Sequence, residues 1–263
     1  MPKTSYDAPA VRKAVFLIEL LCESEKPLGV SEISQALDVN SNMVFRLLKT
    51  LEEEGWIVRS SEGPKYSMSL RPFHFTSKTV RRMGVRTAAD EPLRTLWEET
   101  HESCYLGVID GTRTLFLEHL DATGDVRVMA TPGGRFLMHC AAPGKVLLAF
   151  SPVEFVEKVA KVEGLPAQTK NSIKTLKVLQ KELEAVRETG YAIDNEEYAD
   201  GLYCFAAPVF NVKDELAATI GVSVLSLYYS LERTIKELGP KVISAANATS
   251  MSLGSTRQIH FKG

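Results

Sequence analysis

The sequence predicts an α+β protein with a small helical N-terminal domain and a larger C-terminal domain of antiparallel strands and helices. Apolar residues recur at helical spacing within residues 10–55, whereas most apolar runs after residue 103 alternate every second position, as in strands. The chain has 263 residues, and a single hydrophobic core usually stops growing at roughly 250–300 residues, which favours two domains. Charge divides the chain in the same way, because residues 41–86 carry 9 Lys and Arg against 4 Asp and Glu.

Three helices are predicted within residues 10–55. The first spans residues 10–23 and carries one apolar stripe. Ser31 is expected to cap the start of a short second helix, since a serine oxygen accepts a hydrogen bond from the first helical turn. After a turn at residues 38–41, a third helix runs to Gly55, a residue type that commonly ends helices. A short helix, a tight turn and a longer helix are typical of a helix-turn-helix.

Residues 56–70 predict a two-stranded wing, because apolar positions alternate on both sides of a turn at Gly63-Pro64. The third helix presents a polar face opposite its leucines, and the basic excess around it favours a nucleic-acid partner. The alternative is a solvated helix with one stray phenylalanine. The candidate DNA-binding residues are Ser31, Ser41, Asn42, Met43, Phe45, Arg46, Lys49, Arg59 and Lys65.

The C-terminal region follows a linker at residues 71–87 and predicts an antiparallel sheet with helices clustered on one face. Asp110-Gly111 is expected to form the turn between the first two strands. The predicted strands are residues 104–109, 112–120, 126–130, 136–139, 191–194, 203–210 and 216–225. The predicted helices are residues 88–101, 145–150, 152–161, 172–189 and 231–253.

The remaining patterns argue against several classes of protein. No apolar stretch approaches the roughly 20 residues of a membrane span, and the first ten residues contain no apolar signal core. Four scattered cysteines favour a reducing cytoplasm over a disulfide framework. Five histidines without close ligand spacing support no metal site, and no cofactor is expected. Gly144-Lys145 is no phosphate loop, because His139 stands where that pattern needs glycine and Val146 where it needs serine or threonine.

Five segments carry a family resemblance: LGVSEISQALDVNSNMVFRLLKTLEEEGWIVR (28–59), PKYSMSLRPFHF (64–75), LMHCAAPGKVLLAFSP (137–152), GYAIDNEEYADGLYCFAAPVF (190–210) and LAATIGVSV (216–224). With them the chain resembles the IclR (isocitrate lyase regulator) family of bacterial transcription factors. The resemblance implies a winged helix-turn-helix DNA-binding domain at 1–70, a linker helix at 71–87 and a GAF-like effector-binding domain at 88–263. The family usually begins the recognition helix with Pro-Lys-Ser-Thr, where this chain has Asn40, Ser41, Asn42 and Met43. The operator sequence of relatives therefore does not transfer to it.

The resemblance also implies an effector pocket beside the helix that starts at Ala142, whose first backbone N–H groups favour an anion. The candidate effector-binding residues are Met129, Leu137, Ala142, Pro143, Gly144, Asp194, Cys204, Gly221 and Ser223. Gly221 stands where the family often has serine, so more space and a bulkier ligand are expected. Asp194 is expected to accept a hydrogen bond from the ligand. Without the resemblance, the sequence alone would be interpreted as placing Asp194 in a turn, Cys204 in the hydrophobic core and Ser223 in an ordinary strand.

The expected function is a ligand-responsive transcription regulator that senses a small organic acid. One winged helix covers only a half-site, so a homodimer or dimer of dimers is expected on an inverted repeat in double-stranded operator DNA. Helix 10–23 is expected to form part of the dimer contact. Two alternatives remain: a cysteine hydrolase acting on a small acid through Cys204 or Cys140, and a DNA-architectural protein. Neither cysteine lies in a nucleophile motif, so we expect no enzymatic activity, and no membrane partner.

Overall fold

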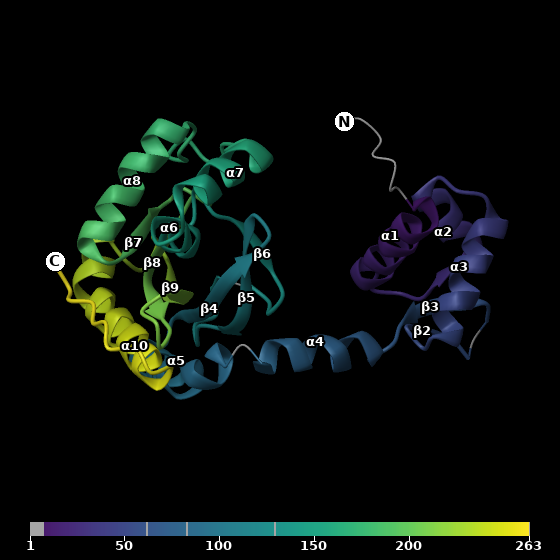
Figure 1. Ribbon diagram of the computed structural model, residues 1–263, viewed down its shortest axis with the longest axis horizontal. Coiled ribbons are helices and arrows are strands. Elements are labelled where there is room, and N and C mark those ends of the chain that lie inside the picture. The colour runs from purple at the N-terminus through teal and green to yellow at the C-terminus, as the bar shows by residue number, and fades with distance from the viewer. Residues whose placement is uncertain (1–7, 62, 83, 129, 263) are drawn as a thin grey trace. The chain divides into compact units, whose positions relative to one another are not determined.

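The computed structural model describes residues 8–61, 63–82, 84–128 and 130–262. The chain forms two compact units, Met1–Thr79 and Val80–Gly263. The unit boundary lies within the expected linker, most of which is one helix, α4 (Arg71–Arg82) (Figure 1). None of the described helices is long and apolar enough to cross a membrane.

The N-terminal unit is a winged helix-turn-helix, as predicted. Its helices are α1 (Pro9–Glu23), α2 (Val30–Leu37) and α3 (Ser41–Glu53), and one apolar face of each packs into a core around Leu17, Ile33 and Leu48. In α1 this face contains Leu17 and Leu21, whereas part of the predicted stripe, including Val11 and Val15, is exposed. The wing strands β2 (Ile57–Arg59) and β3 (Lys65–Met68) are antiparallel. A two-residue strand that the sequence did not predict, β1 (Leu28–Gly29), pairs with the other edge of β3 and completes a β1-β3-β2 sheet.

The start of α2 differs from the prediction. Gly29, not Ser31, is the N-cap, and Ser31 is already inside the helix. The Gly29 N–H donates to the carboxylate of Glu32 at 2.7 Å, so the backbone before α2 is held by an acidic side chain in the first turn. At α3 the side chain of Asn40 is the cap, since its Oδ1 accepts from the Met43 N–H at 2.9 Å.

The C-terminal unit contains a six-stranded antiparallel sheet in the order β6-β5-β4-β9-β8-β7 (Figure 1). Its strands are β4 (Ser103–Asp110), β5 (Arg113–Leu120), β6 (Arg135–Leu137), β7 (Ala192–Asn195), β8 (Leu202–Phe210) and β9 (Leu216–Leu225). The predicted strand at 126–130 is wrong for its described residues, 126–128 and 130, which form no strand. Met129 lies outside the described residues.

Helices cover both faces of this sheet, which corrects the prediction that they cluster on one face. On one face lie α5 (Val85–Thr100) and α10 (Gly239–Ser252); on the other lie α6 (Ala142–Ala149), α7 (Val153–Glu163) and α8 (Leu176–Thr189). The cause is visible in β4, where Leu106 faces the first helix layer and its neighbour Tyr105 faces the second. A sheet that is apolar on both faces must be covered on both faces.

The predicted C-terminal helix at 231–253 is present without a gap from Leu231 to Ser252, but it is not α-helical throughout. A three-residue α9 (Leu231–Arg233) leads into a π-helical turn at Thr234–Leu238, and α10 begins at Gly239. Pro240 has no N–H and therefore cannot donate to a carbonyl of the preceding turn. The wider turn lies at the point where that hydrogen bond would be missing.

Candidate functional site

Three of the predicted polar residues form one row across the C-terminal sheet. Asp194 of β7 lies opposite Cys204 of β8, and Cys204 lies opposite Ser223 of β9. Residues that are directly paired on neighbouring strands point to the same face. All three side chains are buried, and the Cys204 Sγ lies 3.2 Å from the Ser223 Oγ. Segments far apart in the sequence thus place three polar groups side by side.

This row lines a pocket of about 180 Å³ on the face covered by α6. The wall of the pocket is largely aromatic: the Tyr105 ring stacks on Phe116 with centroids 4.6 Å apart, and Phe116 packs on Phe136 at 4.4 Å. The full lining is Tyr105, Phe116, His119, Val128, Ala130, Phe136, Ala141, Pro143, Asp194, Tyr198, Ala199, Leu202, Cys204 and Ser223. An apolar body with a few convergent polar groups is the usual form of a small-molecule site.

Asp194 is the only carboxylate among the described lining residues. Its Oδ1 accepts from the Glu197 N–H at 2.7 Å and from the Tyr198 N–H at 3.3 Å, whereas its Oδ2 is buried without a partner. Burial is the main reason that the pKa of Asp194 is raised to about 7, and the negative charge of Glu197 raises it further against the hydrogen bonds that lower it. Near neutral pH this carboxyl group therefore exists in both protonation states.

Gly221 does not provide the extra ligand space that the sequence suggested. It lies directly opposite Tyr105 in the β4–β9 pair, and a Cβ on Gly221 would lie 2.6 Å from the Tyr105 Cζ and closer still to the hydroxyl. The tyrosine ring fills the space that a side chain at 221 would occupy. Tyr105 is fully buried, and its hydroxyl has no hydrogen-bond partner.

Behind the pocket, the buried Lys145 of α6 joins three elements. Its Nζ donates to the Glu197 Oε1 at 2.6 Å and to the Glu182 Oε1 at 2.9 Å. Burial alone would lower the pKa of Lys145, but the two carboxylates raise it, so the ammonium stays charged. Glu197 follows β7 and Glu182 lies on α8, so this cluster ties α6 and α8 to the loop that follows Asp194.

The predicted pocket residues are only partly brought together. Those that line the pocket are Pro143, Asp194, Cys204 and Ser223, and those that do not are Leu137, Ala142, Gly144 and Gly221. Gly144 instead permits close packing, because a Cβ there would lie 2.6 Å from the Met138 carbonyl carbon. Sequence reasoning missed Tyr105, Phe116 and Phe136; the alternation of β4 and β5 could have placed the first two on the face of Cys204.

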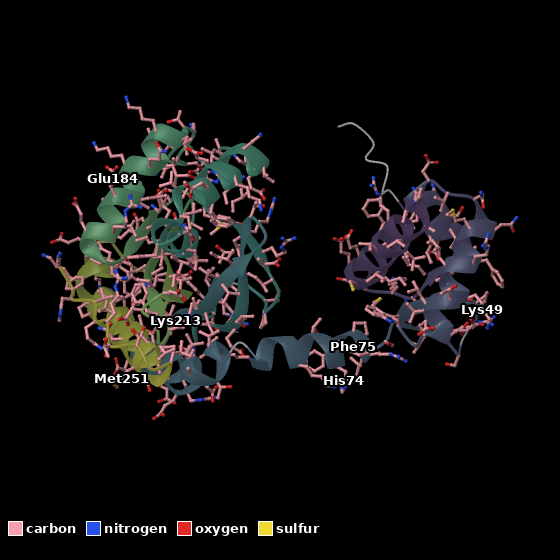
Figure 2. All side chains as sticks on the ribbon, viewed as in Figure 1. Lys49, His74, Phe75, Glu184, Lys213 and Met251 are labelled. Atoms are coloured by element: carbon pink, nitrogen blue, oxygen red, sulfur yellow. The ribbon has the colours of Figure 1, made fainter. Side chains whose placement is uncertain are left out.

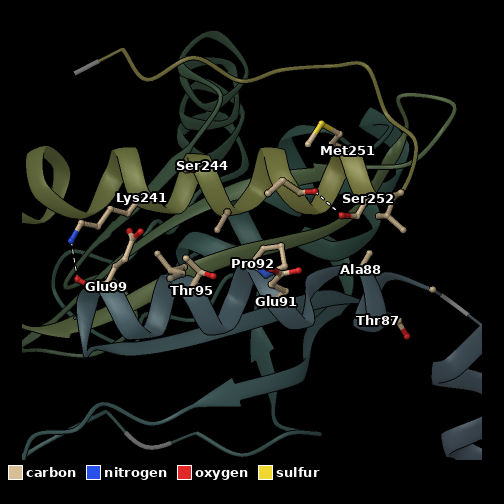
Figure 3. Close-up of a pocket in the computed structure, with 15 residues that line it drawn as sticks. Thr87, Ala88, Glu91, Pro92, Thr95, Glu99, Lys241, Ser244, Met251 and Ser252 are labelled. Atoms are coloured by element: carbon tan, nitrogen blue, oxygen red, sulfur yellow. Dashed lines mark hydrogen bonds between the residues drawn. The ribbon is translucent and has the colours of Figure 1, made fainter.

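A larger groove of about 870 Å³ lies between α5 and α10 on the opposite face of the sheet (Figure 3). It is lined by small residues such as Ala88, Ser244 and Ala248, and Lys241 crosses it to donate to the Glu99 carbonyl at 2.8 Å. None of the described buried side-chain atoms that lack a partner lies there. The smaller pocket, with two such atoms, has the chemistry of a binding site.

In the N-terminal unit, α3 presents Asn42, Phe45, Arg46 and Lys49 to solvent, with Phe45 57% exposed. Lys49 points outward from α3 in Figure 2 and pairs with Glu53 at 3.6 Å. Ser31, Ser41, Arg59 and Lys65 are also exposed, whereas Met43 is half-buried. The exposed amide, guanidinium and ammonium groups on one helix are those that hydrogen-bond to base edges and phosphates.

The cysteines lack the properties of nucleophiles. Burial, followed by the charge of Asp194, raises the pKa of Cys204 well above its usual value, and burial raises that of Cys140 to about 12. Both are therefore protonated thiols at neutral pH, whereas a catalytic cysteine needs a lowered pKa. These thiol states give no support to the alternative of a cysteine hydrolase.

The N-terminal unit is a winged helix-turn-helix whose third helix is polar on its exposed face. The C-terminal unit encloses a small pocket with three polar side chains. Together these features define a ligand-responsive transcription regulator. The family model for the IclR helix-turn-helix domain matches residues 10–61, and that for the bacterial transcriptional regulator IclR C-terminal domain matches residues 77–251. The chain belongs to the IclR family.

Individual relatives agree with this assignment. The chain is 29% identical over 245 residues to the HTH-type transcriptional regulator KdgR of Escherichia coli K12, covering 93% of this chain and 92% of that one. The crystal structure of Thermotoga maritima IclR is similar with a TM-score of 0.77 at 25% identity, covering 93% and 98% of the two chains. An IclR homologue from Microbacterium hydrocarbonoxydans, complexed with 4-hydroxybenzoate, has the same fold with a TM-score of 0.81 at 18% identity and the same coverage.

Proposed function

We propose that the effector of this regulator is a small organic acid bound in the pocket over Asp194, Cys204 and Ser223. The observation that carries the proposal is the buried Asp194 Oδ2, which has no hydrogen-bond partner in a residue that lines an apolar, aromatic-walled cavity. An unpaired buried carboxyl oxygen is costly unless a ligand or water completes it. At about 180 Å³ the pocket is smaller than the roughly 300 Å³ of the smallest drug-sized sites, so its ligand has at most one ring.

We further propose that the acid binds when Asp194 is protonated. None of the described lining residues is a lysine or arginine, and two carboxylates in contact would repel each other. A protonated Asp194 removes that repulsion and donates its hydrogen to the ligand carboxylate. The Ser223 hydroxyl is a second donor, and the positive end of the α6 dipole, where Pro143 lines the pocket, favours the negative charge. The homologue that binds 4-hydroxybenzoate shares this fold, which supports an acid of this size.

Calorimetric titration of the full chain against pH tests the proposal. A panel of monocarboxylic acids with two to nine carbons, including benzoate and 4-hydroxybenzoate, should contain a ligand. Its affinity should be constant below pH 6.5 and fall above pH 7 by up to about tenfold per pH unit, since one proton is taken up on binding. A ligand hydroxyl that donates to ionised Asp194, as expected from the sequence, would give an affinity that rises with pH.

The other titratable groups around Asp194 leave this range clear, except for Glu197, whose pKa is also raised by burial. Lys145 remains charged, because its pKa is raised. Burial raises the pKa values of the Tyr105 hydroxyl and the Cys204 thiol well above their usual values. Burial also raises the pKa of the Tyr198 hydroxyl. His119 in the pocket wall has a pKa lowered by burial, so it is neutral above pH 6.5. Glu197 shares the Lys145 ammonium, so a Glu197→Gln control shows whether Asp194 alone carries the proton.

For DNA, we propose that a homodimer places two α3 helices on an inverted repeat. The support is the apolar surface of α1, where Val11 is 64% exposed and Val15 and Phe16 are 46% and 44% exposed. When a helix carries exposed apolar residues in addition to its buried face, a second copy of the chain can bury that exposed surface. Sedimentation with and without a duplex selected from random DNA tests both the dimer and the symmetry of its site.

A further inference from the structure

We propose that the Tyr105 hydroxyl is a direct hydrogen-bonding partner of the effector, placed in the pocket by the absence of a side chain at Gly221. This inference rests on the proposed function and deepens it, because it names a residue that selects ligands carrying an acceptor oxygen. Tyr105 was not among the site residues expected from the sequence.

The backbone register explains how the tyrosine reaches the pocket. Tyr105, Gly221, Ala206 and Ala192 form one row across β4, β9, β8 and β7, next to the row of Ser223, Cys204 and Asp194. Because the other three residues of this row are a glycine and two alanines, no large side chain stands beside Tyr105 on this face of the sheet. The ring lies over Gly221, since a Cβ on that residue would lie 2.6 Å from the Tyr105 Cζ.

Packing holds the ring in one orientation. The Tyr105 and Phe116 rings are nearly parallel, with 8° between their planes and 4.6 Å between centroids, and Phe136 packs on the other end of this stack. The side chain is fully buried. A phenol held in this way meets a ligand without losing rotamer freedom on binding, which favours affinity.

The hydroxyl is buried without a hydrogen-bond partner among the described residues, and Tyr105 lines the same pocket as Asp194. Two unpaired polar atoms in one small cavity need a ligand with at least two polar positions. A carboxylate has two oxygens: one accepts from the Tyr105 O–H and the other meets the carboxyl group of Asp194. An apolar ligand of the same shape would leave both protein groups unpaired, and sites of this kind discriminate strongly against such analogues.

Replacement of Tyr105 by phenylalanine tests this assignment, because it removes one oxygen and keeps the stacked ring. We expect Tyr105→Phe to bind the tightest acid of the monocarboxylic panel at least tenfold more weakly at pH 6.5, by calorimetry on the full chain. The apo protein should be as stable as wild type or more so, since the lost hydroxyl makes no internal hydrogen bond. Tyr203→Phe is the matched control, because Tyr203 lies on β8, two strands from β4, and packs against the core on the opposite face.

The outcomes separate this inference from the function beneath it. If wild type binds an acid and Tyr105→Phe binds it equally well, Tyr105 is not a ligand contact, while the acid pocket stands. A less stable apo Tyr105→Phe with weaker binding would assign the hydroxyl a structural role and overturn the inference. If wild type binds no acid of the panel, the proposed function fails and the inference fails with it.

Discussion

Lys145 and Glu197 form a buried ion pair in which Nζ and Oε1 are 2.6 Å apart, and Lys145 is completely inaccessible to solvent. Glu197 follows Asp194 by three residues, and its N–H donates to the Asp194 Oδ1. The pair therefore fixes the loop that orients the pocket carboxyl group. Glu182 also pairs with the Lys145 ammonium, so the cluster holds one positive and up to two negative groups.

Lys145→Met should destabilise the protein by about 3–5 kcal/mol, because removal of the lysine leaves the buried Glu197 carboxylate uncompensated. Urea unfolding followed by circular dichroism measures the change. Lys236→Met is the control, since Lys236 is exposed and pairs with Glu232 one helical turn away; exposed pairs contribute little. Equal midpoints for Lys145→Met and wild type would show that the buried pair is replaceable by apolar contact.

Asp194→Asn should stabilise the protein above pH 7 and have little effect near pH 4. The folded-state pKa of Asp194 is raised from 3.8 to about 7, so the folded state disfavours the ionised form that the unfolded state adopts. Its destabilising effect is absent below pH 3.8, grows between the two pKa values and reaches at most about 4 kcal/mol above pH 7. Thermal unfolding from pH 4 to 8.5 measures it.

Asp214→Asn is the matched control with the opposite sign. The Asp214 carboxylate accepts from the Ser255 hydroxyl at 2.6 Å and from two backbone N–H groups, and the serine hydrogen bond is the main reason that its pKa is lowered. Asp214 therefore stabilises the fold at neutral pH and loses that effect as the pH falls through its pKa. The same pH trend in both variants would contradict the assigned cause at Asp194.

Gly144→Ala should destabilise the C-terminal unit, because the new methyl group would overlap the backbone of Met138. Overpacking against backbone costs about 1–3 kcal/mol or more, and α6 would have to shift. Gly124→Ala is a control in which the nearest atom is 3.6 Å away. The unfolding midpoints in denaturant are measured for both variants. An unchanged midpoint for Gly144→Ala would mean that α6 shifts to accommodate the methyl group without loss of stability.

Arg46→Ala should weaken operator binding more than Lys49→Ala. A lost base contact costs about 1–3 kcal/mol and relaxes specificity, whereas a lost phosphate contact weakens all sequences and lowers the salt dependence. Lys49 already pairs with Glu52 at 4.0 Å and Glu53 at 3.6 Å, so it must give up these partners to meet DNA. Gel shifts at several salt concentrations, with Lys177→Ala of α8 as control, measure this; full binding by both α3 variants would remove α3 from the reading role.

If α1 forms the proposed dimer contact, Val15→Asp should yield a monomer and weaken operator binding with it. Val15 is 46% exposed on α1, and an isolated charge in an apolar contact is costly. Sedimentation velocity at micromolar concentration measures the state, with Val178→Asp on the exposed face of α8 as control. A variant that remains dimeric would place the contact on another surface.

The N-terminal unit was largely predictable from sequence because its three helices and wing each bury one face. Val44 and Leu48 repeat at helical spacing, and both are buried as that spacing predicts. The capping of α2 was not predictable in the same way. Ser31 and Gly29 both precede the apolar run, and the choice between them depended on whether Glu32 could reach back to a free N–H.

The pocket was less predictable because the central strands are buried on both faces. Leu106 packs in the core on the far side of the sheet, whereas its neighbour Tyr105, which was not expected in the site, lines the pocket. When both faces of a sheet are covered, the residues on both faces are apolar, so composition does not show which face a given side chain points to. Asp194, Cys204 and Ser223 were placed through family resemblance, and the register that aligns them in one row became visible only in the sheet.

The two units have separate hydrophobic cores, one around Leu17 and Ile33 and the others around the C-terminal sheet. A substitution in the row of Asp194, Cys204 and Ser223 leaves the packing of α3 untouched, and each of the three can be exchanged without altering strand pairing, because register depends on backbone hydrogen bonds. One or two replacements in this row could therefore change which effector the chain binds without changing the DNA sequence that α3 recognises.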